Sequence, residues 1–194
     1  MEERFESFDM IIKNDESVLR IKCTDVLSEE VGQLISLLEL ELYNSNKLGD
    51  NSIGLAASQI GIAKNIAIIR TNNSEFNINL VNCKIKRSYD PTIFKDEGCL
   101  SFPGRVEDTI RFQEVYVVDN FVEPHNFIAT GLLAAACQHE IDHFNGKIFY
   151  DYVKKVIKVQ QKLKSNDICY CGKIDSKTGN FLKFKKCCGK VFNL

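Results

Sequence analysis

The chain has 194 residues, 44% of them hydrophobic and 26% charged, which is typical of one well-buried globular domain with a small appendage. No apolar run reaches the length of a membrane span. The acidic N-terminus fits neither a secretory signal nor a basic transit peptide, so we expect a cytoplasmic protein. The net charge of −1 divides into −9 for residues 1–150 and +8 for residues 151–194. The positive charge of residues 151–194, the C-terminal tail, suggests an anionic binding partner, although a solvated lysine face explains this charge equally well.

Residues 10–22 resemble an extended entry segment with a turn at Asn14–Asp15. A helix is expected next, with Ser28 as its N-cap and with its end near Tyr43. One face of this helix carries apolar residues at helical spacing, namely Val31, Leu34, Ile35, Leu38 and Leu42. Residues 44–51 then form a loop.

Residues 52–61 carry no charge and include several small residues, and their polar side chains are Ser52, Ser58 and Gln59. We expect them to form a tightly packed loop or strand. Gly54 allows a close backbone approach, and the Gln59 amide can both donate and accept hydrogen bonds. Runs rich in β-branched residues predict further strands at residues 65–70, 78–83, 115–118 and 127–129.

Cys99 follows Gly98, a position that could expose its sulfur to a metal ion, and Pro103–Gly104 indicates a turn soon afterwards. The alternative for a cysteine of this kind is burial as a small hydrophobe. Four other cysteines are grouped near the C-terminus, at positions 169, 171, 187 and 188. In a cytoplasmic protein such grouping favours metal ligands over disulfides.

Residues 139–143 read HExxH, within a helix expected to start at Gly131 and to stop at Asn145–Gly146. Positions i and i+4 of a helix share a face, so His139 and His143 can bind one metal ion. Glu140 lies close enough to act on water at that ion without being a ligand. The pattern alone is short enough to occur by chance.

Three segments in register resemble the peptide deformylases: Gly54-Leu-Ala-Ala-Ser-Gln59, Glu97-Gly-Cys-Leu-Ser101 and Gln138-His-Glu-Ile-Asp-His143. The resemblance spans about residues 10–152. It implies an α+β fold in which small antiparallel or mixed sheets surround a central HExxH helix. It further implies a catalytic domain over residues 1–152.

The resemblance also implies a chemistry. Cys99, His139 and His143 would hold one divalent metal, usually Fe²⁺, with Zn²⁺, Ni²⁺ or Co²⁺ able to replace it. Glu140 would transfer the proton of a water molecule. The Gln59 amide and the Leu100 N–H would donate to the oxyanion. The implied substrates are N-formylmethionyl nascent polypeptides, and the reaction is hydrolysis of a linear formamide.

The methionine side chain needs an apolar pocket, for which helical geometry nominates Leu132, Ala135 and Ala136, with Ile53 and Gly54 from the first motif. Plain core packing is the alternative for each alanine. Ser52 stands where the family usually has glycine, and Phe144 stands where it usually has leucine. Arg111 matches a family arginine that we expect to pair with Glu97 or Asp142, the alternative being a surface arginine.

The tail adds a basic amphipathic helix or linker over residues 153–166 and a segment over 167–194 that resembles the SEC-C zinc motif, with a longer insert between its cysteine pairs. Cys169, Cys171, Cys187 and Cys188 would bind a structural Zn²⁺. A redox-active or disordered tail is the alternative. The lysines suit ribosomal RNA or an acidic protein, so ribosome docking is a hypothesis for this tail.

Two other functions stay open. One is a different metal-dependent amidase or peptidase, although residues 144–194 offer no further histidine as a third ligand. The second is a catalytically weakened adaptor that docks on ribosomes or translocation factors through its zinc tail. The presence of Glu140 and Gln59 argues against that adaptor.

Overall fold

The computed structural model describes residues 10–71, 77–119, 126–153, 178 and 182–186. Its elements, in chain order, are α1 (Glu16–Leu19), α2 (Ser28–Lys47), β1 (Gly54–Ala56), the 3₁₀ turn η1 (Ala57–Ile60), β2 (Ile66–Ile69), β3 (Ile78–Val81), β4 (Lys84–Gly98), β5 (Val106–Val118), β6 (Phe127–Thr130), α3 (Gly131–Phe144) and the 3₁₀ turn η3 (Phe184–Lys186). They form two antiparallel three-stranded sheets, β1-β2-β3 and β4-β5-β6. The predicted α+β fold is therefore confirmed.

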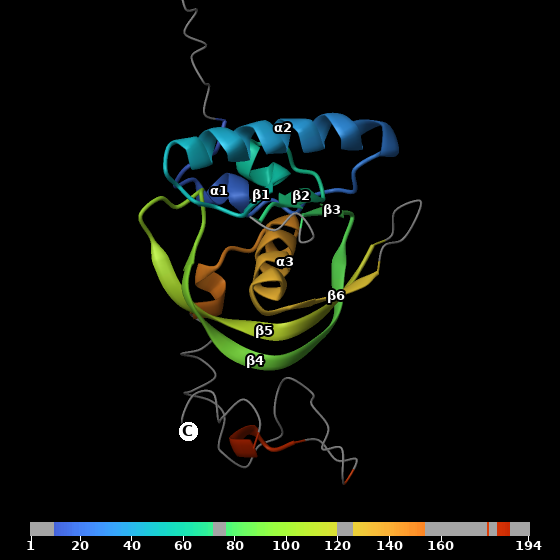
Figure 1. The fold of residues 1–194 in the computed structure, drawn as a ribbon, viewed down its shortest axis with the longest axis vertical. Helices are drawn as coiled ribbons and strands as arrows, with labels where there is room; N and C mark the ends of the chain where they lie inside the picture. Colours follow the sequence, from blue (N-terminus) through green and yellow to red (C-terminus); the bar gives the residue numbers. More distant parts are fainter. Residues whose placement is uncertain (1–9, 72–76, 120–125, 154–177, 179–181, 187–194) are drawn as a thin grey trace, which may run out of the picture.

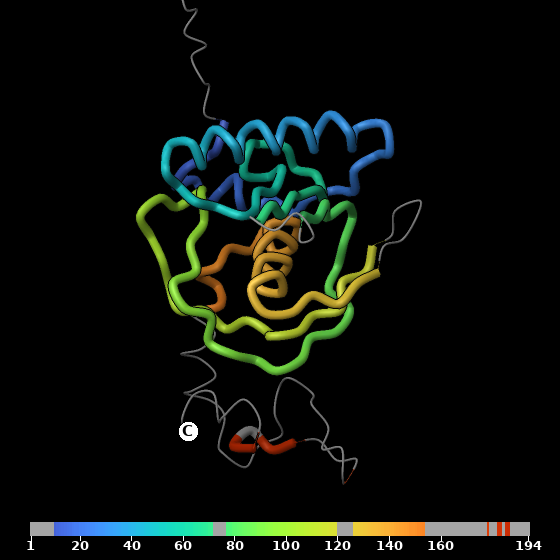
Figure 2. Tube along the Cα trace, in the orientation of Figure 1, coloured from blue at the N-terminus to red at the C-terminus, as the bar shows by residue number. Residues whose placement is uncertain are grey.

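Helix α3 lies at the centre, between the small sheet β1-β2-β3 and the long curved sheet β4-β5-β6, while α2 covers the far side of the small sheet (Figures 1 and 2). The sequence of β2 explains this layering. Its isoleucines at 66 and 68 pack in the cluster under α2, and Ala67 and Ile69 pack in the cluster around α3. A strand that is apolar at every position is buried on both faces.

Helix α2 differs from its prediction at both ends. Leu27 is the N-cap, and Ser28 is the first helical residue. The Glu30 carboxylate accepts the Leu27 N–H at 2.8 Å, which replaces the expected serine cap. The helix continues to Lys47 because Ser45 is buried and Asn46 bonds to the next loop. Three residues of the predicted apolar face are buried, namely Leu34, Leu38 and Leu42.

The entry segment contains a short helix that we did not predict. Asn14 has a φ of 58°, which confirms a turn there. Asp15 then caps α1, because its Oδ1 accepts the Ser17 N–H at 3.0 Å and the Val18 N–H at 3.4 Å. Our interpretation as an extended segment was therefore wrong for residues 16–19.

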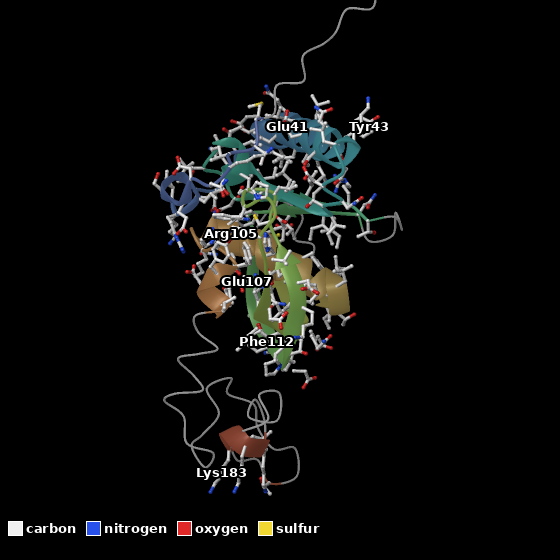
Figure 3. All side chains as sticks on the ribbon, turned by 90° about the vertical axis from the view of Figure 1, so that its left-hand side faces the viewer. Glu41, Tyr43, Arg105, Glu107, Phe112 and Lys183 are labelled. Atoms are coloured by element: carbon white, nitrogen blue, oxygen red, sulfur yellow. The ribbon has the colours of Figure 1, made fainter. Side chains whose placement is uncertain are left out.

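Strand β4 was not predicted at all, and β5 begins well before the predicted run at 115–118. Strand β4 lies at the edge of its sheet and is mostly exposed. It contains Pro91 and many charged residues, which are tolerated at an edge but weaken the sequence signal for a strand. Figure 3 shows Arg105 and Glu107 where β5 begins, and Phe112 further along the strand.

Helix α3 ends where predicted. Asn145 is its C-cap, and Gly146 has a φ of 63°. A Cβ on Gly146 would lie 2.2 Å from the Arg20 carbonyl oxygen, so only glycine fits this close approach. Residues 150–153 are helical again, while the rest of the predicted basic helix and the proposed zinc knuckle lie outside the described residues. In the described part of the chain, no helix combines the length and apolar character needed to cross a membrane.

Candidate functional site

Three predicted ligands converge where the end of β4 meets α3. The candidate ligand atoms of Cys99, His139 and His143 all lie within 4.8 Å of one another. The Cys99 Sγ lies 3.5 Å from the His143 Nε2. Two ligands at about 2.3 Å (sulfur) and about 2.0 Å (nitrogen) from one tetrahedral ion are themselves separated by about 3.5 Å. The spacing therefore fits a divalent metal ion.

One buried atom supports the same interpretation. The Glu140 Oε2 has no hydrogen-bond partner among the described residues. An uncompensated buried carboxylate is costly unless a cation or a hydrogen-bond donor lies beside it. Burial also lowers the pKa of His143 well below its ordinary value, which keeps this imidazole neutral and able to coordinate.

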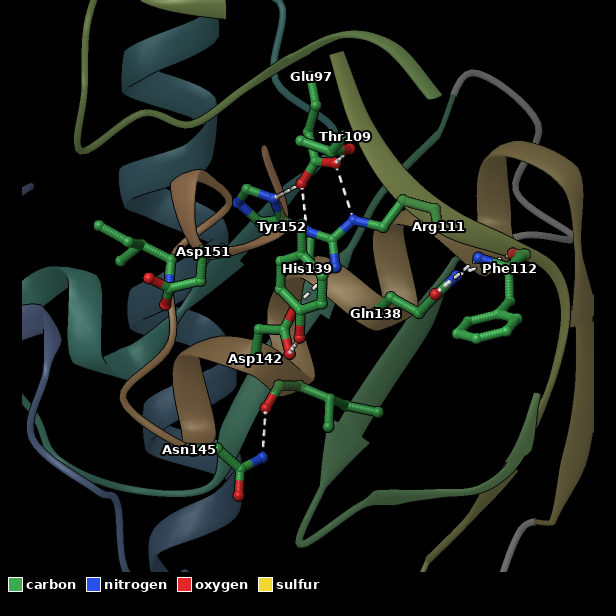
Figure 4. Close-up of polar contacts among 12 residues, drawn as sticks. Glu97, Thr109, Arg111, Phe112, Gln138, His139, Asp142, Asn145, Asp151 and Tyr152 are labelled. Atoms are coloured by element: carbon green, nitrogen blue, oxygen red, sulfur yellow. Dashed lines mark hydrogen bonds and ion pairs between the residues drawn. The ribbon is translucent and has the colours of Figure 1, made fainter. Parts of the chain in front are cut away.

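Glu97 orients the first histidine (Figure 4). The His139 Nδ1 lies 2.7 Å from the Glu97 Oε1, so the Nε2 of the ring is left for a metal. Burial alone would lower the pKa of His139, but its contacts with Cys99 and Glu97 outweigh burial and raise that pKa. The carboxylate keeps a proton on the Nδ1 and fixes the direction of the ring, and a metal ion at the Nε2 would take the place of the second proton.

Arg111 holds Glu97 in turn and is almost fully buried. Its Nε donates to the Glu97 Oε2 at 2.8 Å, its Nη2 donates to the Glu97 Oε1, and its Nη1 donates to the Asp142 Oδ2 at 2.6 Å. The Thr109 hydroxyl also donates to Glu97. The expectation that Arg111 pairs with Glu97 or Asp142 is confirmed, because it pairs with both.

Gln59 faces the site from η1. Its Oε1 accepts the Ala56 N–H at 2.9 Å, which leaves the Nε2 to point toward the cavity. That Nε2 donates to the Cys99 Sγ at 3.3 Å and to the Ser101 Oγ at 3.2 Å. An N–H group held beside the sulfur ligand can donate to an oxygen that arrives there.

Glu140 is buried against Gly54. A Cβ at position 54 would lie 2.2 Å from the Glu140 Oε1, so the glycine of the first motif makes room for this carboxylate. Burial raises the pKa of Glu140 to about 7, with a smaller contribution from Glu97. A carboxyl group with that pKa can both take and return a proton near neutral pH.

A cavity of about 130 Å³ opens beside these groups. All five residues that we predicted for the substrate pocket line this cavity: Ile53, Gly54, Leu132, Ala135 and Ala136. Gln59, Cys99, Leu100, His139 and Glu140 line the same cavity. The candidate catalytic groups and the candidate pocket are therefore continuous in space.

Ser52 also lines this cavity, and Asn46 holds it in place. The Asn46 side chain accepts the Ser52 N–H at 2.7 Å and donates to the Ser52 carbonyl at 2.9 Å. The Ser52 hydroxyl donates to the Gly54 carbonyl at 3.1 Å. The hydroxyl is thus turned back onto its own backbone.

Sequence reasoning missed several residues of the site. Phe94 and Asp96 line the cavity, and Ser101 and Thr109 anchor Gln59 and Glu97. Ser101 was available as the last residue of the second motif, whereas Thr109 carries no local signal. The four tail cysteines at positions 169, 171, 187 and 188 lie outside the described residues.

A family model described as polypeptide deformylase matches residues 8–159. A peptide deformylase of Thermodesulfovibrio yellowstonii is 38% identical over 151 residues, which cover 74% of this chain and 87% of the relative. A peptide deformylase of Stutzerimonas stutzeri is 33% identical over 151 residues, covering 76% and 86%.

Solved structures agree with these sequence matches. The crystal structure of a peptide deformylase from Legionella pneumophila is similar with a TM-score of 0.64 and 30% identity, covering 79% of this chain and 98% of that one. A peptide deformylase from Synechococcus elongatus, solved in complex with actinonin, has a TM-score of 0.65 and 32% identity, covering 78% and 84%.

Proposed function

Because this chain belongs to the polypeptide deformylase family, we propose that Cys99, His139 and His143 hold the catalytic divalent metal with which it deformylates nascent peptides. The convergence of these three ligands beside a cavity carries the proposal. When bound with an open coordination position, such a cation lowers the pKa of water and polarises a carbonyl. The family relationship supports the deformylase activity, and the ligand geometry supports these three residues.

Glu140 is the proposed proton carrier. It lies next to His139 in sequence, and its carboxylate borders the cavity without joining the ligand cluster. A pKa raised to about 7 leaves it partly ionised at neutral pH, so it can accept a proton from water and pass it to the leaving amine.

The Gln59 Nε2 and the Leu100 backbone N–H are the proposed oxyanion donors. Both residues line the cavity next to Cys99. Since the Oε1 of Gln59 is already engaged by Ala56, only the N–H side of the amide can turn to a substrate oxygen. Fixed donors of this kind stabilise developing negative charge without having to reorient during the reaction.

The activity is tested with a formyl-Met-Ala peptide under anaerobic conditions. The wild-type protein should release formate. Glu140→Gln should retain metal but lose on the order of 10²–10⁴ in kcat, because general acid–base catalysis contributes about that much. Wild-type turnover by the variant would exclude the role of Glu140. An unchanged metal content per chain in Cys99→Ser would exclude the ligand set.

The pocket for the methionine side chain is proposed at Ile53, Gly54, Leu132, Ala135 and Ala136. The support is that Ala135 and Ala136 leave space where larger residues would fill the cavity. Ala135→Phe should weaken turnover of formyl-methionyl peptides far more than it weakens metal binding. Equal turnover by this variant and the wild type would remove the assignment.

Fe²⁺ is the proposed native metal, with Zn²⁺, Ni²⁺ or Co²⁺ able to replace it. One thiolate and two imidazoles suit all four ions, so the donor set alone does not select among them. Metal analysis of protein purified without oxygen tests the identity. More than one zinc ion per chain, with iron only a minor component, would overturn the choice of Fe²⁺.

For the tail we propose a structural Zn²⁺ held by Cys169, Cys171, Cys187 and Cys188, and a contact with the ribosome through the surrounding lysines. Support comes from the cysteine grouping and from the charge of +8 over residues 151–194. A cytoplasmic location is proposed with it, since nascent chains are the substrate.

Two measurements test the tail. Serine replacements of all four tail cysteines should remove one zinc ion per chain while leaving the Cys99 site loaded. A chain that ends at residue 152 should cosediment less with ribosomes at low salt. Unchanged zinc content or unchanged cosedimentation would each remove the corresponding part of the proposal. The comparisons support neither a different amidase nor an adaptor without catalysis.

A further inference from the structure

Tyr152 touches the buried ion pairs behind the candidate metal site (Figure 4). Its hydroxyl donates to the Asp142 Oδ1, and the Cζ atom of Arg111 lies 4.3 Å from the centroid of its ring. That distance allows a cation–π interaction. Tyr152 lies outside the three motifs and among the last described residues before the basic tail.

Arg111 is shared between two carboxylates, and this sharing makes the position of Asp142 important. The Nη1 of Arg111 donates to Asp142, and its Nε and Nη2 donate to Glu97. The Tyr152 hydroxyl satisfies the second oxygen of Asp142. Asp142 therefore takes only one N–H group from the guanidinium, and two remain for Glu97.

The same guanidinium fixes the atom that orients His139. The Glu97 Oε1 accepts from the Arg111 Nη2 and contacts the His139 Nδ1. If Asp142 drew Arg111 toward itself, Oε1 would lose its anchor and the imidazole would lose its fixed direction. Outer partners of metal-binding histidines affect metal affinity in this way.

We propose that Tyr152 is a positioning residue of the metal site: its hydroxyl holds Asp142 and its ring holds Arg111, so that Glu97 stays aligned on His139. The inference rests on the ligand set proposed above. Burial and the neighbouring Asp142 raise the pKa of Tyr152, so its hydroxyl remains a donor throughout the working pH range.

The chain offers a matched control two residues away. The hydroxyl of Tyr150 is also buried, but it has no hydrogen-bond partner among the described residues. The Tyr150 ring packs edge-on against Phe102, with ring centroids 5.1 Å apart, and a phenylalanine would keep this contact. Tyr150→Phe thus removes a tyrosine hydroxyl from the same segment without touching the ion pairs.

The test measures metal release from the full chain. Wild-type, Tyr152→Phe and Tyr150→Phe proteins are loaded with Zn²⁺ and mixed with an excess of a chelating dye. The phase of release that Cys99→Ser lacks belongs to this site. Tyr152→Phe should accelerate that phase about tenfold, the lower end of the effect of outer partners. Tyr150→Phe should release at the wild-type rate.

Tyr152→Leu, which removes the ring as well, should release faster still. Proteins loaded with Co²⁺ provide a second readout, because their visible absorption reports ligand geometry and should shift in the Tyr152 variants but not in Tyr150→Phe. Thermal unfolding of the metal-free proteins verifies that each is folded.

Unchanged release from Tyr152→Phe would overturn the inference, and so would equal acceleration in both phenylalanine variants, which would indicate a general loosening of the segment. A wild-type protein without any phase that depends on Cys99 would instead refute the proposed ligand set. The two failures are therefore distinguishable.

Discussion

The two sides of the candidate metal site differ in polarity: one is lined by charged groups and the other by neutral and apolar groups. On the side of His139, a buried arginine and two buried carboxylates orient the imidazole. On the side of Cys99, the neutral Gln59 amide contacts the sulfur, and an apolar cluster packs behind it. That cluster contains Leu19, Phe102, Ile148, Phe149 and Tyr150.

This difference shows that orienting a ligand and placing a ligand need different surroundings. An imidazole must present one particular nitrogen, and a charged partner on the other nitrogen enforces that choice. A thiolate has no such preference, so close packing is sufficient to place it. Both sides contain a cation–π contact between an arginine and a tyrosine, Arg111 with Tyr152 and Arg105 with Tyr150. Of these two arginines, Arg111 is buried and Arg105 is exposed.

Arg111→Met should produce the largest effect on stability. It leaves Glu97 and Asp142 buried without their cation, and removing one partner of a buried ion pair costs about 3–5 kcal/mol. The free energy of unfolding of the metal-free protein, measured in urea, should fall by this amount. Arg105→Met is the matched control and should cost about 1 kcal/mol or less. Equal losses in the two variants would erase the distinction between the sides.

Gln59→Ala should affect the reaction more than the fold. Loss of one oxyanion donor raises the barrier by about 2.7–4 kcal/mol, or on the order of 10²–10³ in kcat. Ser101→Ala, which leaves the amide in place, should change kcat far less. Steady-state kinetics on a formyl-methionyl peptide measures both. A kcat of Gln59→Ala within threefold of the wild type would contradict the proposed donor.

Acid should weaken the His139 side selectively. Burial alone would raise the pKa of Glu97, but hydrogen bonds from Arg111 and His139 outweigh it and lower that pKa below its ordinary value of 4.5. The ionised carboxylate therefore stabilises the fold fully above about pH 4.5 and loses this contribution as pH falls through its folded-state pKa.

Each unit by which folding lowers the pKa of Glu97 adds about 1.4 kcal/mol to the free energy of unfolding. The difference in unfolding free energy between metal-free wild type and Glu97→Gln should shrink as the pH falls below about 4.5. A difference that stays constant there would show that Glu97 contributes no pH-dependent stability.

Phe149→Leu should produce the smallest effect. The Phe149 ring centroid lies 4.1 Å from that of Tyr150 and 6.3 Å from that of His139. Leucine keeps most of the volume and loses only the aromatic contacts, so the unfolding free energy should fall by less than about 1.5 kcal/mol. The kcat should stay near the wild-type value. A loss of kcat comparable to that of Gln59→Ala would show that apolar packing also orients the ligands.

The sequence predicted the parts of the site that depend on local spacing. Two histidines one helical turn apart and a carboxylate beside the first define a helix face before any tertiary contact is known. Arg111 was also predicted, because it matches an arginine of the family that we expected to pair with Glu97 or Asp142. These residues carry most of the proposed chemistry.

The parts that depend on long-range geometry could not be predicted. The contact of Tyr152 with Asp142 and Arg111 requires the reversal of the chain at Gly146, and no motif marks that tyrosine. Strand β4 escaped notice because it pairs on one side only, so Pro91 and its charged neighbours cost little there. Helix α2 runs past Tyr43 because tertiary contacts hold its last turn.

The burial of strand β2 on both faces determines how fast its amide hydrogens exchange with solvent. All four of its residues are fully buried, Ile66 and Ile68 under α2, Ala67 and Ile69 against the cluster around α3. Exposing its amides requires both layers to separate, which amounts to global unfolding. We therefore expect β2 and α3 to exchange together and most slowly. Both histidines of α3 then remain in register for as long as the molecule is folded, and any local opening falls to the loops around Cys99.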